Sequence, residues 1–138
     1  MIKQRPLPSD ISERLLKLAT LFKQDQRVQF AYLFGGLATG APKPLSDVDI
    51  AVYLDAASVN AVTKLDFVGI VSDTLGTDEV DVVILNTAPT SLTGRILKQR
   101  KVLVDNQPFL RHLFESRTMR EFFDFSRKEH DILARRFA

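Results

Sequence analysis

Two aspartates separated by one residue, Asp47 and Asp49, stand just before the apolar run at residues 50–54. A short run of this kind predicts a buried strand. Because side chains two residues apart in a strand point to the same face, the two carboxylates would lie side by side. Like charges held together repel, and a divalent cation between them relieves the repulsion. The motif therefore predicts a strand that begins at a cation site.

A glycine pair, Gly35 and Gly36, follows a second apolar run at residues 31–34. The run predicts the end of a buried strand, and the glycines allow a tight turn close to a ligand. From Leu37 onward the chain can start a helix whose free N–H groups attract phosphate. We therefore expect this turn to cradle phosphate groups.

A third carboxylate, Asp81, interrupts the β-branched run at residues 79–85, which also predicts a strand. If this strand neighbours the one at residues 50–54, three carboxylates converge. Three oxygen ligands beside a phosphate-binding turn suit magnesium-assisted phosphoryl or nucleotidyl transfer. The residues thus indicate a class of reaction, although they do not identify its substrate.

Other kinds of site also contain the Asp-x-Asp pattern. An EF-hand would need a longer series of oxygen ligands closed by a glutamate. A dehalogenase-like phosphatase would carry its aspartates at the end of an apolar strand near the N-terminus, whereas Pro-Leu-Ser precedes Asp47 here. The glycine pair and Asp81 together favour the magnesium-assisted transfer.

The spacing of these motifs resembles the polymerase-beta-type nucleotidyltransferase superfamily. Ten residues separate the Gly35-Gly36 pair from Asp47 and Asp49, and Asp81 follows on a later strand. The small size is similar to that of the minimal nucleotidyltransferase (MNT) branch. Most of the chain is covered by the resemblance, including residues 89–104, which are similar to the helix and strand that follow the third aspartate in such proteins.

The resemblance implies an α/β (α+β) fold: a small mixed β-sheet flanked by helices, the nucleotidyltransferase fold, with C-terminal helices. It implies a single domain over residues 1–138, with a catalytic core at residues 1–106 and a C-terminal helical segment at residues 107–138. One departure stands at Gly36, where the family usually has serine, and another at Thr39, where it often has arginine. The missing serine hydroxyl removes one hydrogen bond to a phosphate or its metal.

The resemblance also implies the chemistry of the site. Asp47, Asp49 and Asp81 would be the catalytic residues and the ligands of two Mg²⁺ ions, and Gly35 and Gly36 would bind the phosphates of ATP. AMP would pass from ATP to a hydroxyl group, expected to be a tyrosine, of a partner HEPN-domain ribonuclease toxin. The chain would then act as the antitoxin.

Two alternatives remain open from the sequence. One is an antitoxin that acts by binding alone, which the glycine at position 36 in place of serine suggests. The other is an aminoglycoside-type nucleotidyltransferase acting on a small hydroxyl compound, although such enzymes usually have more chain after the catalytic domain.

Charged side chains outside the motif are weaker candidates. Lys43, Arg95 and Lys98 are candidate phosphate or acceptor contacts, but solvated side chains are the simpler interpretation. His112 and His130 lie far from the motif in sequence, so they are poor candidates for a metal ligand or a base.

Amphipathic spacing predicts two helices before the Asp81 strand. The first has Ser9 or Asp10 as its N-cap and Glu13 as a capping-box partner. The second covers residues 58–75 and ends at a C-cap glycine, Gly76. The apolar positions expected to face inward are Ile11, Leu15, Leu18 and Leu21 or Phe22 in the first helix, and Val59, Val62, Leu65, Val68, Val71 and Leu75 in the second.

The C-terminal third interleaves aromatic and basic side chains. Six of the ten phenylalanines fall at residues 109–138, among seven arginines and lysines. One interpretation is one or two helices that pack phenylalanines on the sheet and leave arginines in solvent. The other is a docking surface for a protein partner, because aromatic and arginine residues are enriched in interface anchors.

Composition limits the remaining possibilities. A chain of 138 residues, 45% hydrophobic and 26% charged, is expected to form one soluble domain with a real core. Cysteine is absent, which excludes disulfides and thiolate metal sites. We expect no membrane span, no signal peptide and a cytoplasmic location. The formal net charge is only +2, so we expect no nucleic-acid partner.

Overall fold

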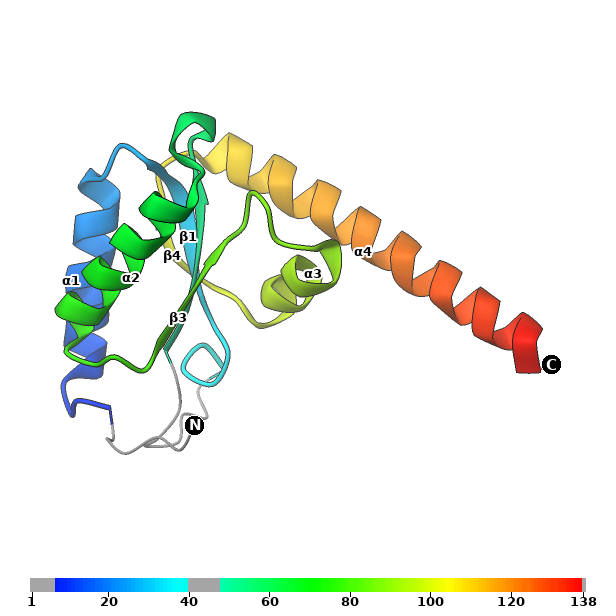
Figure 1. Ribbon diagram of the computed structural model, residues 1–138, viewed down its shortest axis with the longest axis horizontal. Coiled ribbons are helices and arrows are strands. Elements are labelled where there is room, and N and C mark those ends of the chain that lie inside the picture. The colour runs from blue at the N-terminus through cyan, green and yellow to red at the C-terminus, as the bar shows by residue number, and fades with distance from the viewer. Residues whose placement is uncertain (1–6, 40–47, 138) are drawn as a thin grey trace.

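The computed structural model describes residues 7–39 and 48–137. Its elements follow the expected succession of helices and strands, with one 3₁₀ turn, and the long last helix projects from the rest of the molecule (Figure 1). In chain order they are α1 (Ile11–Gln24), β1 (Val28–Phe34), β2 (Val48–Leu54), η1 (Ala56–Ser58), α2 (Ala61–Leu75), β3 (Val80–Ile84), α3 (Thr90–Gln99), β4 (Lys101–Asp105) and α4 (Pro108–Phe137).

The four strands form one mixed sheet in the order β3-β2-β1-β4. β1 pairs antiparallel with both β2 and β4, whereas β2 and β3 pair in parallel. Two parallel strands cannot be joined by a tight turn, and here the crossover connection is made by α2. The predicted small mixed sheet is confirmed, and β3 is one of its edges.

Helices cover the two faces of the sheet separately. On β2, Ile50 and Val52 point into the larger apolar cluster, which α1 and α2 complete. Ala51 and Tyr53 point the other way, into the cluster shared with α3 and the start of α4. Figure 1 shows α1 and α2 together on one side of the strands, with α3 and α4 on the other. Because side chains alternate along a strand, every second residue faces α3 and α4.

The first helix differs from the prediction at its N-terminus. Asp10 is the N-cap, but its side chain caps no backbone N–H and instead accepts a hydrogen bond from Arg14 Nε at 2.8 Å. The predicted capping box is therefore wrong. The inward stripe is confirmed with Phe22, which is buried, whereas Leu21 is exposed.

The second helix begins later than predicted, and its predicted inward face is confirmed at Val71 and Leu75 but not at every position. Asn60 is its N-cap and accepts from the Thr63 N–H at 2.8 Å, whereas the preceding residues form η1. Val62 and Leu65 were expected inside, but they are 78% and 72% exposed. Phe67 takes their place in the core. The predicted C-cap is confirmed, because Gly76 has a left-handed φ of 70°.

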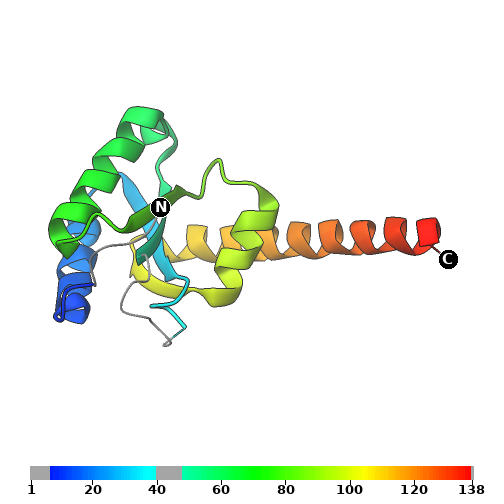
Figure 2. The ribbon, with the colours of Figure 1, turned by 60° about the horizontal axis from the view of Figure 1, so that its bottom comes forward.

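The C-terminal segment is one helix of 30 residues, where more than one was expected from the family resemblance. Its first half belongs to the core: the centre of the Phe114 ring lies 5.5 Å from the centre of the Phe30 ring and 5.1 Å from the centre of the Tyr53 ring. From Phe123 to Arg136 every residue is exposed. Figure 2 shows this distal half extending past all other elements. The two interpretations of the segment thus apply to different halves of α4.

A partly buried polar network ties the first half of α4 to the sheet. The Tyr32 hydroxyl donates to Glu115 at 2.7 Å, and Arg100 and Arg111 lie 3.0 and 3.1 Å from the same carboxylate. Arg111 also pairs with Asp105 of β4 at 2.8 Å. Burial raises the pKa of Glu115, but the hydrogen bond from Tyr32 and the two arginines outweigh it, so its pKa is lowered. Burial and the same carboxylate raise the pKa of Tyr32.

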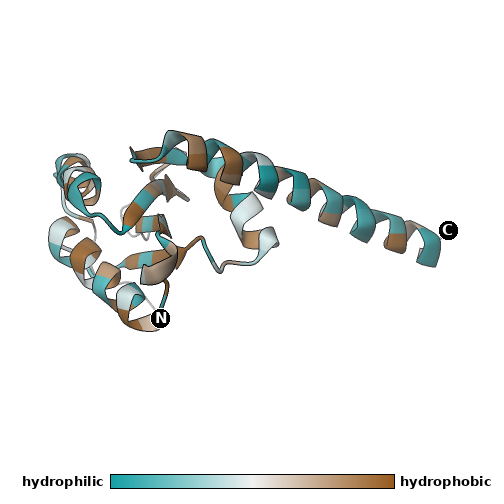
Figure 3. Ribbon diagram, turned by 90° about the horizontal axis from the view of Figure 1, so that it is seen from above, coloured by the Kyte–Doolittle hydropathy of each residue, from teal (hydrophilic) through white to brown (hydrophobic). Residues whose placement is uncertain are grey.

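Hydropathy along the helices matches this division. In Figure 3, apolar colour is more frequent over the first turns of α4, and polar colour predominates toward its end. Across residues 7–39 and 48–137, no helix combines the length and the apolar character that crossing a membrane requires.

The contact between α3 and α4 can be tested at Gly94. A Cβ added there would overlap the ring of Phe122 on α4. We expect Gly94→Ala to lower the free energy of unfolding by about 1–3 kcal/mol, the usual cost of overpacking. Urea unfolding followed by circular dichroism measures it.

The matched control is Gly69→Ala on α2, where a Cβ would meet nothing within 4 Å. This change should raise the free energy of unfolding by about 0.5–1 kcal/mol, because alanine is the better helix former. Equal effects of the two substitutions would contradict the packing described for Phe122.

Candidate active site

Two of the three predicted aspartates are direct neighbours in the sheet. Asp49 on β2 is paired in register with Asp81 on β3, and on its other side it faces Phe34 of β1. Both carboxylates project from the face that α3 and α4 partly cover, because the residues alternating with them point to α1 and α2. The predicted convergence of Asp49 and Asp81 is therefore present in the fold.

The glycine turn lies against the same carboxylate. Gly35 follows β1 directly and has a φ of 72°, in the left-handed region that favours glycine. A Cβ at this position would overlap Asp49 Oδ2 and come within 3.1 Å of its Cγ. The absence of a side chain at Gly35 thus lets the backbone turn approach Asp49.

Hydrogen bonds close the turn within a few residues. The Thr39 N–H donates to the Gly35 carbonyl at 3.1 Å, and the Thr39 hydroxyl donates to the Gly36 carbonyl, also at 3.1 Å. In the described part of this segment the chain makes a single turn, whereas a helix starting at Leu37 was expected. The turn still follows the C-terminal end of β1, as predicted.

Asp47 and Lys43 lie outside the described residues, so the expectations for them stay predictions. Among the residues that are described, no three or more His, Cys, Asp or Glu side chains come together as a possible metal site. Asp49 and Asp81 supply two adjacent carboxylates, and carboxylate oxygens are the ligands that Mg²⁺ prefers. The donor chemistry of this pair fits the expected ion.

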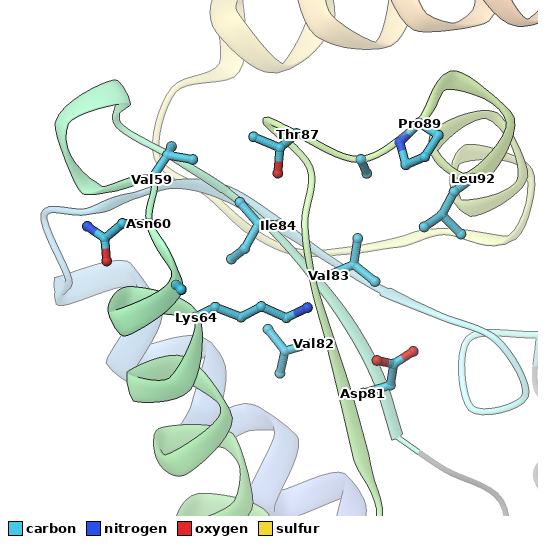
Figure 4. A pocket seen from close by; sticks show the side chains of 12 residues that line it. Val59, Asn60, Lys64, Asp81, Val82, Val83, Ile84, Thr87, Pro89 and Leu92 are labelled. Carbon is cyan, nitrogen blue, oxygen red and sulfur yellow. The ribbon is translucent and has the colours of Figure 1, made fainter.

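A pocket of about 610 Å³ opens beside Asp81, on the outer side of β3 (Figure 4). Its polar lining consists of Asp81, Lys64 of α2, the N-cap Asn60, and Thr87 from the loop before α3. The rest of the lining is predominantly apolar and includes Val59, Val82, Val83, Ile84, Pro89 and Leu92. The pocket therefore joins a carboxylate of the candidate site to a largely apolar space.

The weaker candidates lie apart from this pair. Lys98 on α3 places its amino group 4.7 Å from the centre of the Phe122 ring, and the Arg95 guanidinium donates to the Ser91 carbonyl of its own helix at 3.3 Å. His112 and His130 are exposed on α4. None of these four side chains lines the pocket beside Asp81.

Sequence reasoning missed Lys64 and Asn60 as pocket residues. Both fall in the helix predicted at residues 58–75, which was analysed only for its inward apolar positions and its C-cap, and Lys64 looks like any solvated lysine in the sequence. Asn60 carried a usable signal, because asparagine is a preferred N-cap and would have placed the start of α2 correctly. The start of α2 lies beside β3 because α2 connects β2 to β3, its parallel neighbour in the sheet.

A mixed sheet that pairs two carboxylates beside a glycine turn defines a class: the nucleotidyltransferases that the sequence motifs resemble. The chain belongs to the polymerase beta nucleotidyltransferase family, because the model described as Polymerase beta, Nucleotidyltransferase matches residues 16–109. The match includes the glycine pair and all three aspartates. No functionally curated protein matches the chain.

Solved structures confirm the predicted fold and its likeness to MNT proteins. A toxin-antitoxin structure with AMP-PNP is 25% identical, with a TM-score of 0.71 over 91% of this chain and 98% of that chain. A variant of the MntA-HpeT toxin-antitoxin is 26% identical, with a TM-score of 0.68 over 96% and 99%. A tri-AMPylated Shewanella oneidensis HEPN toxin in complex with MNT antitoxin gives 23% identity and 0.69 over 92% and 98%, which shows the fold alone.

The approach of the glycine turn to Asp49 gives a testable prediction. Gly35→Ala combines a left-handed φ with a methyl group that displaces the Asp49 carboxylate. We expect a loss of about 1–3 kcal/mol in unfolding free energy, and at least about tenfold weaker binding of a magnesium nucleoside triphosphate, equivalent to about 1.4 kcal/mol. Urea unfolding and calorimetric titration measure the two effects.

Gly76→Ala is the matched control, because Gly76 also has a φ of 70° but would meet only the flexible Arg14 side chain. It should lose stability without losing nucleotide affinity. Equal nucleotide binding by Gly35→Ala and Gly76→Ala would show that the turn does not support the site.

Proposed function

We propose that the chain is an antitoxin-type nucleotidyltransferase. It transfers AMP from ATP to a hydroxyl group, a tyrosine, of a HEPN-domain ribonuclease toxin and thereby neutralises the toxin in the cytoplasm. The observation that carries the proposal is the pairing of Asp49 with Asp81 beside the Gly35 turn. Support comes from similar chains described in toxin-antitoxin complexes, one with AMP-PNP and one with a tri-AMPylated HEPN toxin.

Each residue of the site has a role in this proposal that follows from its position. Asp47, Asp49 and Asp81 would hold two Mg²⁺ ions, which would supply positive charge to the triphosphate and to the attacking and leaving oxygens. Gly35 and Gly36 receive the phosphates through backbone N–H groups, because no side chain at Gly35 stands between the turn and Asp49. Asp49 is the central ligand of the site, since it lies between the glycine turn and Asp81.

The transfer step forms one bond and breaks one. The acceptor oxygen attacks the α-phosphorus of ATP, and the bond from that phosphorus to the bridging oxygen of pyrophosphate breaks. The hydroxyl proton passes to a carboxylate oxygen of Asp81, which is exposed at the edge strand where an acceptor can reach it. The products are the AMP-modified acceptor and pyrophosphate.

A second candidate is an antitoxin that neutralises the toxin by binding alone. Gly36 in place of the usual serine favours it, because one contact to phosphate is missing. The distal half of α4 fits either candidate, since both require a stable complex with the toxin.

The distal half of α4 continues the buried stripe of its first half into solvent. Phe125 lies eleven residues after Phe114, and Ile132 lies seven residues further, so both return to the same side of the helix after nearly whole turns. Phe125, Ile132 and Leu133 are 52%, 62% and 48% exposed. The match to a toxin-antitoxin structure over 96% of the chain includes most of this helix. We assign the toxin as the partner of this stripe.

Catalysis is tested by the intact mass of a HEPN-domain toxin, co-expressed with the chain or added to it, after incubation with Mg²⁺ and ATP. Wild-type chain should add one or more AMP units. Asp49→Asn and Asp81→Asn should each lower the initial rate at least about a hundredfold, as expected when transition-state charge loses a stabilising group. Asp47→Asn should do the same.

Asp73→Asn, on the exposed side of α2, is the control and should transfer at the wild-type rate. A stable complex without any gain of mass would favour the binding antitoxin instead. If the experiment shows no complex and no gain of mass, both candidates are refuted and the search turns to small-molecule acceptors.

Docking on α4 is tested by replacing Phe125, Ile132 and Leu133 together with serine. These side chains make little contact within the chain, so the free energy of unfolding should change by no more than about 0.5 kcal/mol per site. Affinity for the toxin, measured by calorimetry, should fall at least about tenfold, because apolar anchors dominate interface energies.

The control is Arg127→Ser with Asp131→Ser, a charge-neutral pair on the opposite side of the same helix. It should leave toxin affinity unchanged. If both sets of substitutions weaken the complex equally, the apolar stripe is not the docking surface.

A further inference from the structure

The distal half of α4 is supported through the first half of the same helix, at two places. The first is Glu115, where polar groups join the helix to the sheet, and the second is Phe122, whose ring packs against Gly94 of α3. Beyond Phe122 the helix continues for about 22 Å at 1.5 Å per residue, and Figure 2 shows it projecting past the other elements. The direction of this part therefore depends on how the two supports hold the first half.

The support at Glu115 joins α4 to three other parts of the fold. The Glu115 carboxylate accepts a hydrogen bond from the Tyr32 hydroxyl of β1 at 2.7 Å and lies 3.0 Å from Arg100 Nε, at the end of α3. Arg111 of α4 lies 3.1 Å from the same carboxylate and pairs with Asp105 of β4 at 2.8 Å. Glu115 is therefore the residue at which the contacts of α4 with β1, with the end of α3 and with β4 meet.

These polar contacts restrict the direction of α4 more than the apolar contacts around them do. Burial of apolar surface is non-directional, so the Phe114 ring could remain buried while the helix tilts. A charge-assisted hydrogen bond, in contrast, weakens steeply when its distance or angle changes. A network whose members are all paired in one arrangement favours that arrangement over the alternatives.

β1 connects this network to the candidate site. Tyr32 lies on β1 three positions before Gly35, and Phe34 of the same strand pairs with Asp49. The helix is thus hydrogen-bonded to the strand that leads into the glycine turn. The direction of the distal half is therefore defined relative to the carboxylates of the site.

We propose that Glu115 is a positioning residue, which sets the direction of the distal half of α4 and so the place of the docked toxin relative to Asp49 and Asp81. The inference rests on the proposed function, in which the toxin docks on this half of the helix. A change of direction of about 10° at Phe122 would move the end of the helix by about 4 Å, given its length of about 22 Å. A misplacement of about 1 Å can already slow a reaction about a hundredfold.

The direction of α4 is measured with two spin labels on the full chain, which has no cysteine of its own. Lys17→Cys on α1 and Ala134→Cys on α4 provide exposed positions for them, and Ala134 lies on the side of the helix opposite Phe125. Pulsed electron paramagnetic resonance gives the distribution of distances between the labels. With Glu115→Ala we expect the mean to shift or the distribution to widen by about 3 Å, as a tilt of about 10° would produce at position 134.

Tyr32→Phe is a milder variant, because it removes one hydroxyl and keeps the buried ring. It should change the distances in the same sense as Glu115→Ala but by less. The control is Glu121→Ala, which replaces an exposed glutamate on the same helix and should leave the distances unchanged. Unchanged distances in both Glu115→Ala and Tyr32→Phe, or an equal change in Glu121→Ala, would overturn the proposal.

The effect on the toxin is measured by separating binding from transfer. Glu115→Ala keeps the docking side chains, so the affinity for the toxin should stay within about threefold of the wild type, as for independent sites. The initial rate of AMP transfer at saturating toxin should fall at least about tenfold. Glu115→Gln keeps an oxygen that can accept from Tyr32, so it should restore part of this rate. A purely structural role would lower the free energy of unfolding and leave the rate per bound complex unchanged, and that result would overturn the proposal.

The distance measurement needs neither toxin nor catalysis, so this proposal and the proposed function can fail separately. A chain whose distances respond to Glu115→Ala but that never adds AMP to a toxin would refute the transferase and keep Glu115 as the residue that directs α4. A chain that transfers AMP at the wild-type rate with Glu115→Ala would overturn the positioning and keep the transferase.

Discussion

The parallel pairing of β2 with β3 is the constraint on which the rest of the arrangement depends. It sets Asp49 beside Asp81, and it requires a crossover connection, which α2 supplies. Once α1 and α2 cover one face, the alternation of side chains leaves both carboxylates on the other face. A shift of the register by one residue would turn one carboxylate into the apolar cluster, where an unpaired charge is costly.

The antiparallel pairing of β1 with β2 adds the second half of the site. It brings the C-terminal end of β1 next to the N-terminal end of β2, so the turn at Gly35 meets Asp49. A left-handed backbone and a close approach are required at the same residue, and glycine alone meets both conditions without strain. Gly35 is therefore required for the close approach of the turn to the Asp49 carboxylate, independently of any contact with phosphate.

Local patterns predicted the strands and the C-cap at Gly76, and the family resemblance implied the small mixed sheet. They failed where a helix has apolar residues on more than one side: Val62 and Leu65 are exposed, and Phe67 is buried instead. The rotation of α2 is set by its N-cap at Asn60 and by its contact with the sheet, neither of which the apolar spacing contains. Apolar spacing also fails to separate the two halves of α4. Its apolar stripe continues into the distal half, where no other element packs against the helix.

By itself the sequence predicted the chemistry of the site, because carboxylates at alternate strand positions beside a glycine pair at a strand end suit magnesium-assisted transfer. It also determined the family, through the spacing of those motifs. Only the tertiary structure decided that Asp49 and Asp81 are neighbours, that Lys64 and Asp81 line the same pocket at the edge of the sheet, and that the distal half of α4 is exposed. These features join residues far apart in the sequence, and their positions follow from strand order and helix rotation, which contacts across the whole fold select.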